Sequence, residues 1–278
     1  MEPGVGVDLA SLQSGQGRVN PTSYPRVLLP SALYAASYLP RESRSIRVLH
    51  LEGLPNRQKR TKRHPGQEIP LQGQLSVQSL DESPHYTALS YVWAQAELKE
   101  RRVIHIQQDG VTIDELEITE NCYQALMSIR QRAGSISLWV DAICINQADD
   151  DEKCHQVALL GDIYGLATMT YAWLGEGHAG TDKAMRYVRA QGLRSTRLQL
   201  GLAAATTEQT KREERRRYTG LFFRDILAWY IEKNDLDFIL ETVWLTRAWT
   251  FQEFVLSHNI TLLCGNEELR WEEFFAAI

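Results

Sequence analysis

The pattern of apolar and polar residues predicts a group of β-strands in the first half of the chain. "SIRVLHLEG" alternates apolar and polar side chains, which is the period of a strand with one buried face. "EIPLQGQLSVQSL" and "HYTALSYVWA" are rich in residues that favour strands. "RRVIHIQQDGVTID" predicts a hairpin, because two alternating runs flank the turn signal Asp109-Gly110. Before about residue 44, "SALYAASYLP" alone fits a short helix.

Strand and helix then alternate along the chain. "TENCYQALMSIRQRA" has a helical period, with Thr119 as its expected N-cap. "SISLWVDAICINQ" is an apolar run broken by one acid, typical of a strand buried on both faces. "DDDEKCHQVALLGDIYGLAT" predicts one helix, and "MTYAWLGEG" predicts another buried strand. The apolar stripe of that helix is expected to contain Val157, Leu160, Ile163, Tyr164 and Ala167. This alternation predicts a parallel α/β core with crossover helices.

Helix dominates after residue 181. "TDKAMRYVRAQ" predicts a short amphipathic helix, and the stretch from residue 207 to 235 predicts a long one that begins highly charged. "NITLLCGNEELRWEEFFAAI" closes the chain with a strand, a Gly-Asn turn and the start of a helix.

Composition places the chain among soluble globular proteins. It has 278 residues, of which 44% are hydrophobic and 23% charged, and a formal net charge of -5. No apolar run approaches the roughly 18 to 20 residues that a membrane helix needs. The N-terminus lacks a basic segment ahead of an apolar core, so it does not predict a signal peptide. We therefore expect a cytoplasmic protein without a membrane partner.

The net charge and the spacing of the cysteines limit the kinds of ligand and binding partner that we expect. The mild acidity argues against nucleic acid as the main partner. The basic run Arg57–Arg63 is either a nuclear-import or phosphate-binding patch or a solvated loop, and we favour the loop. The cysteines form no CxxC pair and no metal-ligand spacing with the histidines, so they predict reduced core thiols and no metal site. These cysteines are Cys122, Cys144, Cys154 and Cys264.

Candidate chemistry is expected where the parallel strands end, because loops converge at that edge of the sheet. Asp141 interrupts an apolar run, and it either orients a ligand or caps the next loop. Asn146 can bind a substrate edge, although we favour a role in a turn. Ser90 lacks the flanking glycines and the His/Asp pair of a serine nucleophile. The chain also lacks a Walker loop, a GxGxxG loop and an HExxH motif.

Glu253 is the remaining candidate. In "WLTRAWTFQEFVLS" it follows Trp249 by four residues, on the same side of a helix, and Arg247 lies near. A carboxylate among aromatic rings can stabilise a developing cation. Cleavage of a nicotinamide–ribose bond needs this help and no general acid, because the leaving group is already cationic. The alternative is a helix carboxylate paired with Arg247, which the residues alone favour.

Three long blocks of the chain resemble a known family. "YTALSYVWA", "LWVDAICINQADDDEKCHQVALLGDIYGLATMTYAWLG" and "WLTRAWTFQEFVLSHNITLLCGNEELRWEEF" occur in this order. They resemble the signature blocks of the fungal heterokaryon-incompatibility (HET) domain, over roughly Ile46 to Phe274. Ala94 stands where that family usually has glycine. The resemblance implies a role in fungal allorecognition and programmed cell death, a form of innate immunity.

HET domains are in turn similar to TIR domains. "ALSYVW" resembles the first TIR strand, and "LWVDAICINQ" the second strand and its loop. "TRAWTFQE" resembles the TIR motif S-x-W-C-x-x-E, with Thr250 in place of cysteine. The implied fold is α/β: a TIR-like, flavodoxin-like, mostly parallel sheet flanked by helices, with an N-terminal β extension and an inserted helical region.

The same resemblance implies the domain boundaries. A partly disordered N-terminal segment, residues 1–44, is expected to precede a HET domain at 45–278. The expected TIR-like core covers about 84–178 and 240–278, and the helical insertion about 181–235.

The TIR likeness also implies a site. Glu253 falls on the glutamate of NAD+-cleaving TIR enzymes, Trp249 becomes a stacking wall and Arg247 an orienting charge. The expected substrate-binding residues are Ser90, Tyr91, Trp93, Asp141, Asn146, Arg247 and Trp249. NAD+ would be a substrate rather than a cofactor, and cleavage would follow self-association into a homo-oligomer with an unknown incompatibility or receptor partner. The alternative is a non-enzymatic death-signalling module that oligomerises and recruits partners.

Overall fold

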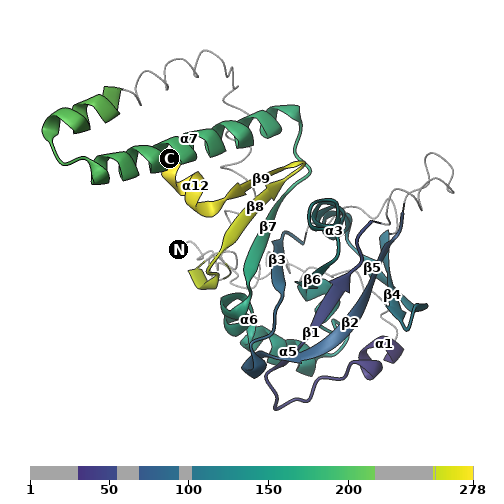
Figure 1. The fold of residues 1–278 in the computed structure, drawn as a ribbon. Helices are drawn as coiled ribbons and strands as arrows, with labels where there is room; N and C mark the ends of the chain where they lie inside the picture. The colour runs from purple at the N-terminus through teal and green to yellow at the C-terminus, as the bar shows by residue number, and fades with distance from the viewer. Residues whose placement is uncertain (1–30, 55–68, 94–101, 217–252, 254, 278) are drawn as a thin grey trace, which may run out of the picture.

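The computed structural model describes residues 31–54, 69–93, 102–216, 253 and 255–277 (Figure 1). Within these residues, nine strands form one mixed sheet in the spatial order β5-β4-β2-β1-β6-β3-β7-β8-β9. The strands are β1 (Ser45–Leu51), β2 (Leu71–Ser79), β3 (Thr87–Tyr91), β4 (Arg102–Gln108), β5 (Val111–Ile118), β6 (Ile136–Trp139), β7 (Met169–Gly175), β8 (Ile260–Cys264) and β9 (Glu267–Arg270).

The centre of the sheet is parallel. β3 pairs in parallel with β6 on one side and with β7 on the other, and β7 pairs in parallel with β8. Numbered along the chain, these strands lie in the order 2-1-3-4, which is the flavodoxin-like order. The chain therefore reverses its direction of winding between β3 and β7, and this position is the topological switch point. The predicted α/β fold class is confirmed.

The predicted N-terminal strands extend the same sheet. β1 is antiparallel to both β2 and β6, and the hairpin of β4 and β5 joins through a parallel pairing of β4 with β2. At the hairpin turn, Asp109 and Gly110 have φ of 52° and 78°. Positive φ at both central residues is what a tight type I′ turn requires, so this prediction is confirmed.

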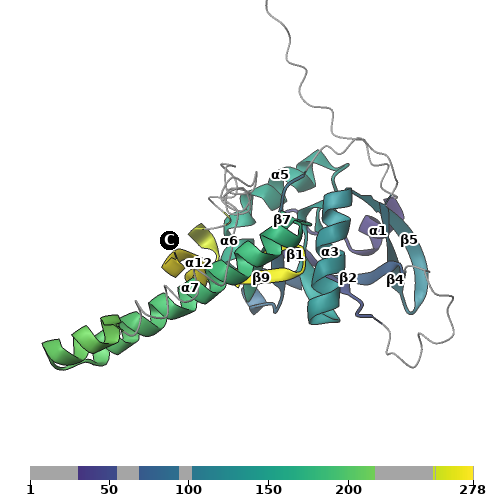
Figure 2. The same ribbon diagram turned by 90° about the horizontal axis from the view of Figure 1, so that it is seen from above.

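Helices cover the sheet (Figures 1 and 2). Those whose bounds lie within the described residues are α1 (Ser31–Ala36), η1 (Leu80–Glu82), α3 (Glu120–Ala133), α4 (Asp141–Cys144), α5 (Asp150–Ala158), α6 (Leu160–Leu166), α7 (Ala179–Ala204) and α12 (Trp271–Ala277). α3 contacts β3, β4 and β7, while α7 and α12 pack on each other and on β8 and β9. The side chain of Thr119 caps α3 by accepting from the backbone N–H of Cys122, as predicted.

Two predicted elements have different bounds. The run "SISLWVDAICINQ" is not one strand: β6 ends at Trp139, and Asp141 opens the short helix α4. Asp141 bends the chain because its Oδ1 accepts from the N–H of Ala142 at 2.7 Å, a local bond that competes with the strand ladder. Asn146 therefore follows a helical turn rather than a strand end. The expected short helix at 181–191 is part of α7, which has 26 residues.

The helix predicted over 149–168 is divided in two. α5 ends and α6 begins at Leu159, so a single stripe does not run along both helices. Val157, expected in that stripe, is 43% exposed, whereas Ile163 and Tyr164 are buried as predicted. Asp149 caps α5 by accepting from the N–H groups of Asp151 and Glu152.

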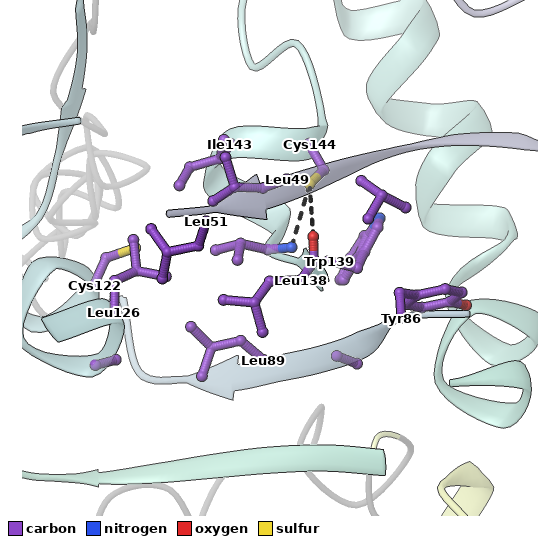
Figure 3. Packing of buried hydrophobic residues seen from close by; sticks show 14 of the residues in the cluster. Leu49, Leu51, Tyr86, Leu89, Cys122, Leu126, Leu138, Trp139, Ile143 and Cys144 are labelled. Carbon is purple, nitrogen blue, oxygen red and sulfur yellow. Dashed lines mark hydrogen bonds between the residues drawn. The ribbon is translucent and has the colours of Figure 1, made fainter. Parts of the chain in front are cut away.

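The main core lies around β1, β6 and β3. Figure 3 shows Leu49, Leu51, Leu89 and Leu138 gathered in one cluster with Ile143 of α4. A second cluster joins α7 and α12 to β8. The cysteines are free thiols, and the prediction of core thiols holds for three of them. Cys122, Cys144 and Cys264 are buried, whereas Cys154 is exposed.

Several expectations lie outside the described residues. They are the basic run Arg57–Arg63, the departure at Ala94, and the part of the expected long helix from residue 217 onward. The division into a segment 1–44 and a domain 45–278 stays a prediction. Among the described helices, none combines the length and the apolar character needed to cross a membrane.

Candidate functional site

A serine and a glutamate meet at the carboxyl end of β3. The Oγ of Ser90 donates a hydrogen bond to Oε2 of Glu253, which lies 163 positions later in the chain. Ser90 is the register partner of Ala172 in β7, so the pair sits beside the switch point between β3 and β7. The side chain of Ser90 is 2% exposed, and that of Glu253 is half-buried.

The helical backbone around Glu253 is anchored to the start of β7. The carbonyl of Glu253 accepts from Oγ of Ser257 at 2.5 Å, and that hydroxyl lies 2.8 Å from Oγ1 of Thr170. The N–H of Thr170 donates to the carbonyl of Asn259 at 2.7 Å. These bonds tie the helical backbone at Glu253, and the connection from it to β8, to the start of β7.

A second polar pair lies just beyond the end of β3. The indole Nε1 of Trp93 donates to Oδ2 of Asp141 at 2.7 Å. The rings of Tyr91 and Trp93 are stacked, with their centroids 6.5 Å apart. Burial raises the pKa of the Tyr91 hydroxyl, and the negative charge of Asp141 adds to the effect. Asp141 thus accepts from the N–H of the next residue, Ala142, with one oxygen and orders an aromatic side chain with the other.

Tyr164 of α6 packs against β3 beside Ser90. Its side chain is 3% exposed, and its hydroxyl lies 3.5 Å from the carbonyl oxygen of Leu89, the residue before Ser90. Burial raises the pKa of this phenol well above its ordinary value, and the charge of Glu253 is the next largest cause. The sequence presented Tyr164 as one residue of an apolar stripe, so its polar contact was missed.

Asn121 is a second residue that the sequence did not mark. Its Nδ2 donates to the carbonyl of Val92 at 2.7 Å, and its Oδ1 accepts from Nε1 of Trp173 at 2.8 Å. One side chain therefore ties the end of β3 to β7 across the switch point. An asparagine in the first turn of a helix carries no periodic signal, and only the folded arrangement shows its role.

Asn146 serves a turn, which is the alternative that the sequence favoured. Its Oδ1 accepts from the N–H of Ala148 at 3.1 Å, and its own N–H donates to Oε1 of Glu152 at 2.7 Å. Glu152 in turn pairs with the buried Arg47 through contacts of 2.5 and 3.0 Å. Arg47 also donates to the carbonyl of Cys144 at 3.1 Å, so a buried ion pair holds the chain on both sides of Ile145, at the end of α4.

The catalytic and substrate-binding roles of the site residues stay predictions. Arg247 and Trp249 lie outside the described residues. Ser90, Tyr91, Trp93, Asp141 and Glu253 do gather at one end of β3. In the described part of the chain, no group of three or more His, Cys, Asp or Glu side chains is arranged to hold a metal ion. Burial raises the pKa of the Cys144 thiol to about 12, which makes it a poor nucleophile.

The strand order and the residues at the carboxyl end of β3 together describe an α/β protein of flavodoxin-like strand order. Its switch point, between β3 and β7, holds a carboxylate. The model of the family "Heterokaryon incompatibility protein (HET)" matches residues 86–253. The chain therefore belongs to the HET family. The matched stretch includes β3, α6 and Glu253, which are the parts that build the candidate site.

A curated relative is also similar. The chain is 30% identical over 198 residues to "Heterokaryon incompatibility protein 6, OR allele" of Neurospora crassa. That alignment covers 66% of this chain and 29% of the relative, so the chain spans less than one third of the relative's length. No solved structure matches the chain.

Proposed function

We propose that this chain is the HET domain of a fungal incompatibility protein, and that it triggers cell death in the cytoplasm by cleaving NAD+ at Glu253. The observation that carries the proposal is the Ser90–Glu253 pair beside the switch point between β3 and β7. Ligands of flavodoxin-like sheets bind at this edge of the sheet. The membership of the HET family and the name of the Neurospora relative support the part of the proposal that concerns incompatibility.

The proposed reaction needs one well-placed carboxylate. The bond between C1′ of the ribose and N1 of the nicotinamide ring breaks, and its electron pair neutralises the positive ring nitrogen. The ribose becomes an oxocarbenium-like cation, which the Glu253 carboxylate stabilises. Water then adds to C1′ and gives its proton to the carboxylate, from which it passes to solvent. The products are nicotinamide, ADP-ribose and one proton.

The neighbouring side chains have proposed parts in binding. The Tyr91–Trp93 stack offers an aromatic surface, and Asp141 orders the indole of Trp93. Arg247 would orient the phosphates or the carboxylate, and Trp249 would stack on a ring of the substrate. Self-association into a homo-oligomer would assemble the active form, as in the TIR-like mechanism, in response to an unknown incompatibility partner.

Expression in fungal cells tests the proposal. Glu253→Gln keeps the shape of the side chain and removes its charge, so cells with this variant are expected to survive and to keep their NAD+. Glu272→Gln, a change of an exposed glutamate in the first turn of α12, is the matched control and is expected to kill like the wild type. Killing by Glu253→Gln with NAD+ levels undiminished would instead support a non-enzymatic module that recruits partners.

A further inference from the structure

We propose that Ser76, His50 and Ser137 form a second reactive site, in which Ser76 is an activated nucleophile that accepts acyl groups from small esters. The three side chains form one hydrogen-bonded row across neighbouring strands of the sheet. This row shares no residue with the candidate site at Glu253, so the inference does not depend on the NAD+ cleavage proposed above.

The pairing of three strands brings these side chains together. Ser137 of β6 is the register partner of His50 in β1, and Gln74 of β2 is the partner of His50 on the other side. Ser76 follows Gln74 by two positions, so it lies on the same face of the sheet, diagonal to His50. Side chains that are opposite or diagonal across neighbouring strands are within reach of one another. The imidazole of His50 can therefore contact both serines.

The imidazole joins the two hydroxyl groups. Nε2 of His50 lies 2.6 Å from Oγ of Ser76, and Nδ1 lies 2.8 Å from Oγ of Ser137. The tautomer protonated on Nδ1 donates to Ser137 and leaves Nε2 to accept the proton of Ser76. The side-chain amide of Gln78 donates to Oγ of Ser76 at 3.4 Å, which suits a hydroxyl proton directed toward His50. A nucleophile bonded to a base, with a third group orienting that base, is the arrangement that activates a serine.

A small ester can reach this row from solvent. His50, Ser76 and Ser137 are partly exposed, and Gln74 is exposed. Among the described strands, β2 pairs with β4 only over Leu71–Gly73, so β1 is the only strand beside β2 at Ser76. An ester can therefore approach Oγ of Ser76 without displacing part of the core.

The proposed reaction is acyl transfer to Ser76, followed by hydrolysis. Oγ of Ser76 attacks the ester carbonyl carbon while Nε2 of His50 takes the hydroxyl proton. The carbonyl oxygen becomes negative, and the side-chain amides of Gln74 and Gln78, on the same face as Ser76, would donate to it. The bond from the carbonyl carbon to the alkoxy oxygen then breaks, and the leaving oxygen takes the proton from His50. Water next attacks the acyl group with His50 again as the base, which frees a carboxylic acid and restores Ser76.

Labelling with a fluorophosphonate, a probe that reacts with activated serines, tests the inference. The purified chain is incubated with the probe, and mass spectrometry of its peptides locates the label. We expect the label on Ser76, and a rate about a hundredfold lower in His50→Gln, which removes the base. Ser135→Ala removes an exposed hydroxyl that accepts from the N–H of Gly53 at 2.9 Å. It is the matched control and should be labelled like the wild type.

Ser137 is expected to be a positioning residue, because it orients the imidazole and does not touch the ester. Ser137→Ala should slow labelling about tenfold, and Ser137→Thr, which keeps the hydroxyl, should restore the rate. p-Nitrophenyl acetate is the ester substrate, and its hydrolysis should slow in the same variants. Folded wild-type protein without label on Ser76, or equal rates in wild type and His50→Gln, would overturn the inference. The position of the label in the wild type needs no variant, so it decides the matter even where a substitution prevents folding.

Discussion

Ser90 and Glu253 are brought together by folding alone, since 163 positions separate them in the chain. Ser90 owes its position to β3, whose residues are all buried, and its hydroxyl donates to Glu253. In the proposed reaction, this buried hydroxyl would act by orienting the carboxylate of Glu253. The effect of the hydroxyl on the rate of the proposed reaction can therefore be measured separately from its effect on the free energy of unfolding.

Ser90→Ala is expected to lower kcat/KM for NAD+ cleavage by about ten- to a hundredfold, because the carboxylate loses an orienting donor. The free energy of unfolding should fall by only about 1 kcal/mol, as for a typical buried hydrogen bond. Enzyme kinetics and urea denaturation measure the two effects. Ser128→Ala removes a buried hydroxyl of α3 that donates to Gly265 at 3.3 Å, and it should leave cleavage unchanged. Equal losses of activity in both variants would contradict the role of Ser90.

Single residues were predictable where the rule that places them is local. Thr119 was expected as an N-cap and Asp109-Gly110 as a turn, because each depends on the backbone within a few positions. The polar contact of Tyr164 was not predictable, because its hydroxyl meets the carbonyl of Leu89, a residue that only the fold brings near. Asp141 was predictable in part. The sequence marked it as an unusual acid in an apolar run, and the structure shows its hydrogen bond with Trp93.

At the scale of elements, the crossing of α7 with α12 depends on a glycine. A Cβ on Gly192 would lie 1.9 Å from the carbonyl oxygen of Glu273, so the two helix backbones approach too closely for any side chain there. A Cβ on Gly201 of the same helix would lie 3.2 Å from a carboxylate oxygen of Glu214, which can move aside.

Gly192→Ala is expected to destabilise the protein by about 1–3 kcal/mol, because the helices must separate. Gly201→Ala should be neutral or stabilise it by up to about 1 kcal/mol, because alanine is the better helix former. Urea denaturation of the two variants measures the difference. A Gly192→Ala protein as stable as Gly201→Ala would show that the backbones do not meet at this crossing.

The helices were harder to predict than the strands. The alternating runs predicted the places of β1 and the β4–β5 hairpin correctly, and the enrichment in strand-favouring residues predicted that of β2. The joint at Leu159 was missed, because residues on either side of it both have helical patterns. The short helix α4 was missed as well, because a continuous apolar run does not distinguish a strand from a buried helical turn.

At the scale of the whole molecule, buried tyrosines make the stability of the core depend on pH. Burial is the first cause of a raised pKa at each of four phenols, and these phenols reach from α1 to α6. They are Tyr34, Tyr86, Tyr91 and Tyr164. All four must stay protonated for the core to remain intact.

We expect stability to fall as the pH rises above about 10, the ordinary pKa of tyrosine. Below that pH the phenols are neutral in both the folded and the unfolded chain, so their contribution is fully present. Above it the unfolded chain loses protons that the folded chain keeps, which favours unfolding. Urea midpoints measured between about pH 8 and 11, together with tyrosinate absorbance, test this. Full ionisation of the tyrosines in a protein that stays folded would contradict it.

The parallel α/β core was predicted from the alternation of strand and helix, and a flavodoxin-like sheet was implied by the resemblance to the HET and TIR families. The sequence could not show that β1, β2, β4 and β5 join the same sheet, because pairing between distant strands leaves no local mark. It could not show either that Ser90 would meet Glu253. Both facts depend on the whole molecule, and the second one gives the candidate Glu253 a hydrogen-bond partner at the end of β3.

The most direct measurement of the central claim is the release of nicotinamide by the purified chain. Concentrated wild-type protein is incubated with NAD+, and chromatography follows nicotinamide and ADP-ribose over time. The account predicts that both appear in equal amounts, that the rate rises more steeply than the protein concentration, and that Glu253→Gln abolishes the reaction. NAD+ left intact by concentrated, folded wild-type protein, or cleaved equally well by Glu253→Gln, would contradict it.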